Sequence, residues 1–143
     1  MKDLTKLFLA VVFGCLVGFG LSGCSKENAA AKKINVAAMT EALKSGDAEA
    51  RINACVELAK AGPRAASAVQ ALIPVLKDND PIVRRLAAYA LGEIGAASAP
   101  ALPTLKEMLG DPDRQVVMQV VNSLRSIDPK NASGLQNVNV STP

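Results

Sequence analysis

The chain has no histidine and no tryptophan, and Tyr89 is its single tyrosine. Without histidine there is no Ser-His or Cys-His pair and no histidine-ligated zinc, which excludes most of the familiar hydrolytic and metal chemistry. The net charge is only +3 over 143 residues, without a basic block or an aromatic cluster, so nucleic-acid binding has little support. We therefore expect no catalysis, no metal, no cofactor and no nucleic-acid partner.

A basic segment, an apolar run and a cysteine motif follow one another at the N-terminus. Lys2 and Lys6 precede an uncharged run over residues 7–21. This run is shorter than the roughly 20 residues that a transmembrane helix needs. It ends in the sequence Leu-Ser-Gly-Cys at 21–24, which resembles the lipobox of bacterial lipoproteins. The resemblance implies cleavage before Cys24 and a lipid on its thiol.

The same N-terminal residues also fit an ordinary secretory signal or a short membrane anchor, in which Cys24 has no role. As a lipoprotein, the protein is anchored to a membrane through Cys24 and faces the periplasm or the cell exterior. The residue after the cysteine is Ser25 and not an aspartate, which favours the outer membrane if the cell is Gram-negative. The mature chain keeps Cys24 and Cys55, and the lipid occupies the first, so no disulfide forms within a monomer.

The rest of the chain repeats itself with a fixed period. Two sets of equivalent residues show it: Asp47, Asp80 and Asp113, and Leu58, Leu91 and Leu124. Successive residue numbers in both sets differ by 33, and a period of this size is typical of stacked supersecondary units. Within each unit, apolar residues recur at intervals of three and four, which is the spacing of an amphipathic helix.

The pattern predicts two helices in each unit and no strand. Each of the three aspartates suits a helix N-cap, and Gly62 and Gly95 suit C-terminal stops. The expected helices cover residues 36–44, 47–61, 65–77, 80–94, 98–109 and 113–127. The expected organisation is a signal peptide at 1–23, a tether at 24–34, a repeat domain at 35–128 and a disordered tail at 129–143.

The segment from Asp78 to Gly95, with the segment from Ala101 to Asp113, closely resembles HEAT repeats, in particular the short type named after phycobilisome lyases. The resemblance implies an all-α fold, an α-solenoid of about three helical hairpins of the armadillo-like kind. It also implies a ladder between repeats that is made by the helix-cap aspartates and by arginines of the first helices. Here those residues are Asp47, Asp80, Asp113, Arg51 and Arg84. Val117 stands where a third arginine is expected.

Solenoids of this kind bind partners on an extended surface. The expected protein-contact residues on the second helices are Gln70, Ile73, Lys77, Thr104 and Glu107, and on the first helices Tyr89, Val117 and Val121. The two valines belong to a wide apolar stripe on the last helix. We expect a partner or a second copy to cover it, or else Leu135, Val138 and Val140 of the tail.

These features favour a lipid-anchored protein-binding module or scaffold in the bacterial envelope, whose partner is an unknown protein. Two alternatives stay open: a phycobilin-lyase-like protein that handles a cofactor, and a structural envelope lipoprotein without a dedicated partner. Cys55 stands next to the core stripe of its helix, so we expect a small buried hydrophobic residue there and not a reactive thiol.

Overall fold

The computed structural model describes residues 34–132, so Cys24 and the tail residues Leu135, Val138 and Val140 lie outside the described part. The α-helices are α2 (Val36–Ala42), α3 (Ala48–Ala61), α4 (Val69–Val75), α5 (Pro81–Ile94), α6 (Leu102–Glu107) and α7 (Arg114–Ile127). Three 3-10 helices accompany them: η1 (Gly62–Ala68), η2 (Gly95–Ala101) and η3 (Met108–Gly110). Residues 34–132 contain no strand. The predicted all-α fold is therefore confirmed.

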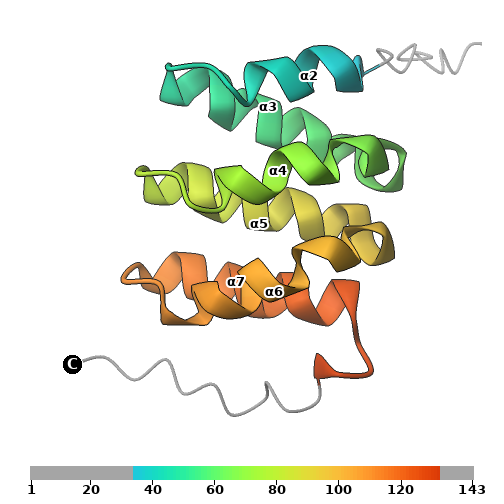
Figure 1. Ribbon diagram of the computed structural model, residues 1–143, viewed down its shortest axis with the longest axis vertical. Helices are drawn as coiled ribbons and strands as arrows, with labels where there is room; N and C mark the ends of the chain where they lie inside the picture. The colour runs from blue at the N-terminus through green and yellow to red at the C-terminus, as the bar shows by residue number, and fades with distance from the viewer. Residues whose placement is uncertain (1–33, 133–143) are drawn as a thin grey trace, which may run out of the picture. The chain divides into compact units, whose positions relative to one another are not determined.

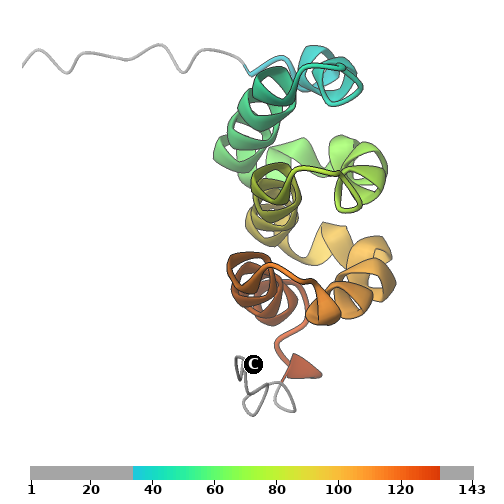
Figure 2. The ribbon, with the colours of Figure 1, turned by 90° about the vertical axis from the view of Figure 1, so that its left-hand side faces the viewer.

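The helices form two layers of a stack. Helices α3, α5 and α7 lie in one layer, and α2, α4 and α6 lie in the other (Figures 1 and 2). Each hairpin therefore packs on the next one along the chain, as the fixed period predicts. Asp47, Asp80 and Asp113 are the N-caps of the first-layer helices, and each carboxylate accepts a hydrogen bond from a backbone N–H of the first turn. The N-cap prediction is confirmed.

The second-layer helices begin differently from the prediction. Gly62 and Gly95 end α3 and α5 with φ of +56° and +76°, which only glycine adopts without strain. The chain then runs through η1 and η2 before α4 and α6 start, so the helices expected at 65–77 and 98–109 begin as 3-10 turns. The second of these turns contains Pro100, and Pro103 lies in the first turn of α6; neither proline has a backbone N–H to donate.

Helices α5 and α7 approach each other closely through small residues. A Cβ atom added at Gly92 would lie 3.0 Å from the Ser123 hydroxyl oxygen and 3.2 Å from the Ser123 Cα atom. The hydroxyl of Ser123 donates to the carbonyl of Ala88 at 2.6 Å, and that of Ser126 donates to the carbonyl of Gly92 at 2.8 Å. Two hydroxyl groups therefore hold the second and third hairpins together at a distance that a larger residue at position 92 would increase.

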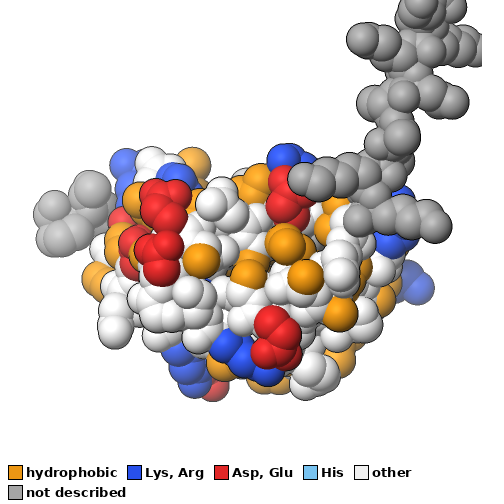
Figure 3. Space-filling view, turned by 90° about the horizontal axis from the view of Figure 1, so that it is seen from above, with side chains coloured by type: hydrophobic (Ala, Val, Ile, Leu, Met, Phe, Trp, Pro, Cys, Tyr) orange, Lys and Arg blue, Asp and Glu red, His pale blue; other side chains and the backbone are white. Residues whose placement is uncertain are grey.

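The N-terminal end of the stack carries polar residues where the later repeats are apolar. Asn53 and Glu57 stand one period before Leu86 and Ala90, and both of these apolar residues belong to the core or pack against it. Acidic and basic side chains stand among apolar ones on this end (Figure 3). A polar outer face is what a terminal repeat needs in order to stay soluble.

Ser98 in η2 is fully buried, and its hydroxyl is the buried side-chain polar group without a hydrogen-bond partner in the described part of the chain. The equivalent residue of the preceding repeat, Ala65, is equally buried. Ser98→Ala should therefore raise the free energy of unfolding by about 1 kcal/mol, because it removes an unpaired polar group. Urea denaturation measures this change, and a loss of stability would show that the hydroxyl has a partner such as a buried water.

Candidate interaction surface

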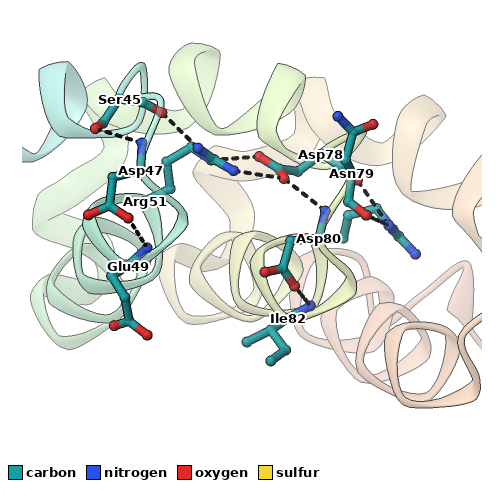
Figure 4. Close-up of polar contacts among 9 residues, drawn as sticks. Ser45, Asp47, Glu49, Arg51, Asp78, Asn79, Asp80 and Ile82 are labelled. Carbon is teal, nitrogen blue, oxygen red and sulfur yellow. Dashed lines mark hydrogen bonds and ion pairs between the residues drawn. The ribbon is translucent and has the colours of Figure 1, made fainter.

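A ladder of arginines and aspartates holds successive hairpins together along one side of the stack. The Arg51 side chain donates from Nε to Asp78 Oδ2 at 2.7 Å and from Nη2 to Asp78 Oδ1 at 3.1 Å (Figure 4). Its Nη1 atom donates to the carbonyl of Ser45 at 2.7 Å. Arg51 therefore joins the loop of its own hairpin to the loop of the next.

The next repeat builds the same arrangement one period later. Arg84 donates from Nε to Asp111 Oδ2 at 2.8 Å and from Nη2 to Asp111 Oδ1 at 2.9 Å. Its Nη1 atom donates to the carbonyls of Asp78 and Asn79 at 2.9 and 3.2 Å. Both contacts with carboxylates are bidentate, and this fork geometry is specific to arginine.

The carboxylates of the ladder are not the ones that the resemblance to HEAT repeats implied. We expected the N-cap residues Asp80 and Asp113 to pair with the arginines, but Asp78 and Asp111 do so. The N-cap carboxylates are already turned toward the first turn of their own helices. The sequence signal was available, because Asp78 and Asp111 are themselves one period apart and each precedes an N-cap aspartate by two positions.

The ladder lowers the pKa values of its carboxyl groups. Burial alone would raise the pKa of Asp78, but hydrogen bonds from the Asp80 N–H and from Arg51, with the arginine charges, outweigh burial and lower it. For Asp111, burial again raises the pKa, while the hydrogen bonds from Arg84 and from the Asp113 N–H and the charge of Arg84 bring it below its usual value. The folded state therefore binds these two protons less readily than the unfolded chain does.

This difference predicts how the stability depends on acidity. The ladder should contribute fully above the unfolded-state pKa, near 3.8, and its contribution should be lost as the pH falls through the lower folded-state values. A double variant with Asp78→Asn and Asp111→Asn should be less stable at pH 7 and should lose less stability between pH 4 and pH 2. Thermal unfolding across this range tests the prediction, with Glu49→Gln, an exposed carboxyl group outside the ladder, as the control.

The five contact residues expected on the second helices are all accessible. Gln70, Lys77 and Glu107 are exposed, and Ile73 and Thr104 are half-buried. The Lys77 ammonium lies 3.3 Å from a Glu107 carboxylate oxygen, so an ion pair links the ends of α4 and α6. Both side chains are about two-thirds exposed, at 68% and 66%. Such a pair contributes little to stability and stays open to competition by another charged group.

Tyr89 is exposed on the other layer, at 39% of its surface, as its helical phase predicts. Ile82, one of the other large exposed hydrophobic residues, lies two helical turns earlier on α5 and therefore on the same face. Met118 on α7 is also a large exposed hydrophobic residue, at 46% of its surface. This outer face of the first layer is a second accessible surface, and sequence reasoning had singled out only its tyrosine.

The two valines expected to offer an apolar contact surface are not accessible. Val117 and Val121 are 5% and 8% exposed, so no bare apolar stripe exists at these positions of α7. Burying each valine side chain stabilises the folded state by roughly 1.5 kcal/mol. The turn after α7 also ends in a buried residue, Ala132. A contact through Val117 or Val121 would first require this burial to be undone.

Cys55 is fully buried, as expected from its place beside the core stripe. Burial, followed by the charge of Asp78, raises the pKa of its thiol to about 12, and Arg51 opposes the rise. The thiol is therefore protonated and unreactive at neutral pH. Between residues 34 and 132, no three metal-ligating side chains gather in one place. None of the described helices is long and apolar enough to cross a membrane.

Stacked helical hairpins, a fixed period and a repeated arginine–aspartate contact define an α-solenoid. Comparison with known families matches residues 36–125 to HEAT repeats. The chain therefore belongs to the HEAT-repeat family, whose modules are generally protein-interaction scaffolds and typically not catalytic. A search of curated proteins found no match to the chain.

Proposed function

We propose that this protein is a lipid-anchored interaction module of the bacterial cell envelope, held at the membrane through Cys24. The anchor rests on the Leu-Ser-Gly-Cys motif at 21–24 and the apolar run before it. Ser25 after the cysteine favours the outer membrane, with the module facing the periplasm, if the cell is Gram-negative. The partner is a protein.

The observation that carries the binding role is the accessibility of the second-layer surface. The ladder arginines are occupied by Asp78 and Asp111, whereas Gln70, Lys77 and Glu107 are exposed. Each hairpin thus carries one set of polar residues that holds the stack together and another set that is free to contact a partner. A mixed-charge surface on a rigid stack suits a protein partner better than a simple anion.

Site-specific photo-cross-linking in native membranes tests this role. A photoreactive amino acid in place of Gln70 on α4 should give a discrete cross-linked protein, while one in place of Arg114, exposed at the start of α7, should not. The two positions form a matched pair, since both are exposed polar residues near the start of a helix. If second-layer positions gave no cross-link in the native host, the proposed scaffold role would be contradicted.

A further inference from the structure

Two adjoining hollows lie where the C-terminal ends of α2 and α4 meet the loops that follow them. The larger has a volume of about 400 Å³ and the smaller about 270 Å³. Both are lined by Leu43, Lys44 and Asp78, so together they form one groove, which we call the α2–α4 groove. A volume in this range is large enough for a side chain and its neighbouring residues.

Basic side chains outnumber acidic ones in the lining of the larger hollow. Lys44, Arg51 and Lys77 line it together with a single carboxylate, Asp78. Arg51 and Asp78 neutralise each other in the ladder, which leaves the two lysines. Each lysine has one glutamate partner, and both of these ion pairs are well exposed. Exposed pairs of this kind are weak, so an incoming carboxylate could replace either glutamate at little cost.

The smaller hollow is mainly apolar. Leu43, Ala71, Pro74 and Val75 form its walls. Leu43 and Val75 are almost fully buried, so Ala71 and Pro74 supply its accessible apolar surface. The groove therefore presents an apolar seat directly beside two cations. This combination fits a ligand that carries an apolar side chain next to carboxylates.

The pair of lysines occurs at one step of the described stack. Lys44 and Lys77 are equivalent residues of successive hairpins, and the next residue of the series is Gly110. The step between the second and third hairpins therefore keeps the ladder but lacks the second cation. Because the ladder repeats at both steps and the lysine pair does not, the stacking of hairpins does not require the lysines.

We propose that the α2–α4 groove binds an acidic segment of the partner protein, which places one apolar side chain against Ala71 and Pro74 and its carboxylates at Lys44 and Lys77. The proposal rests on the protein-binding role proposed above and names the chemistry of the partner. A peptide is favoured over a small anion because the apolar seat would stay empty with an anion alone.

Fluorescence polarisation tests the proposal on the full chain in a neutral detergent. The probe is a labelled octapeptide with one leucine between two pairs of aspartates. Its two controls replace the aspartates by asparagines or the leucine by serine. The variant Lys44→Glu/Lys77→Glu is compared with Lys60→Glu/Lys106→Glu, which makes the same charge change at exposed lysines outside the groove. Lys60 is a close match to Lys44, because it also pairs with a glutamate three residues earlier.

We expect the acidic leucine peptide to bind, and its affinity to fall about tenfold in the groove variant, since two weak attractions become repulsions. The control variant should change the affinity less than about twofold, and both control peptides should bind more weakly. The proposal is overturned if the peptide does not bind, or if the two variants weaken it equally. It is also overturned if only binding to vesicles of phosphatidylglycerol depends on Lys44 and Lys77, because the groove would then recognise lipid.

The cross-link from position 70 distinguishes this failure from that of the scaffold role. If the groove variant still gives the wild-type cross-link and the peptide does not bind, the module binds a protein elsewhere and only the groove assignment is wrong. If the cross-link is also absent from the wild type, the scaffold role itself fails.

Discussion

Replacing Arg84 by alanine should lower the free energy of unfolding by about 3 kcal/mol, which is the lower end of the range for breaking a buried ion pair. The Arg84 and Asp111 side chains are only 13% and 7% exposed. Without the guanidinium, the Asp111 carboxylate would lose both of its bidentate contacts, and two loop carbonyls would lose a donor. Urea denaturation monitored by far-ultraviolet circular dichroism measures the change.

Arg85→Ala is the matched control, because it removes the neighbouring guanidinium from the same helix without touching the ladder. It should change the stability by less than about 0.5 kcal/mol. A double-mutant cycle with Asp111→Asn then isolates the interaction between the two side chains. A fully stable Arg84→Ala protein would show that the arginine is not a structural residue, and binding would become its more reasonable role.

Wild-type protein should partition into the detergent phase with residue 24 at its N-terminus, and the Cys24→Ala variant should not be processed by the lipoprotein route. The loss of processing should be close to complete, because the proposed cleavage and lipid attachment both depend on the Cys24 thiol. Cys15→Ala, which changes a cysteine of the preceding apolar run, is the control and should leave the processing unchanged. Mass spectrometry of the protein from its native host should find residue 24 at the N-terminus with a lipid on it. An unmodified Cys24 would refute the anchor.

The sequence was sufficient for the fold because its repeat signals act locally. The N-cap aspartates and the glycines at 62 and 95 depend on the backbone of a single helix end, so a comparison of successive repeats was enough to place them. The 3-10 starts of the second helices were missed, although Pro100 and Pro103 were visible. Apolar spacing cannot distinguish a 3-10 turn from the first turn of an α-helix.

The partners in the ladder were harder to predict, because they depend on how far one hairpin is offset from the next. Arg51 reaches Asp78 and not Asp80, a difference of two positions that the period does not determine. Whether a partner or the chain itself covers Val117 and Val121 could not be decided from the sequence for a related reason. Helical phase shows which way a side chain points, but not what else in the chain reaches that face.

Helix α2 contains no fully buried residue, and it forms one wall of the groove through Leu43 and Lys44 just beyond its end. Among the described α-helices, it should therefore leave the stack at the lowest free energy, and its amide hydrogens should exchange before theirs. A ligand in the groove would bind only the fraction of molecules in which α2 is docked, so the apparent affinity is the intrinsic affinity reduced by that fraction. Binding would in turn order α2, and slower exchange there would report occupancy of the groove.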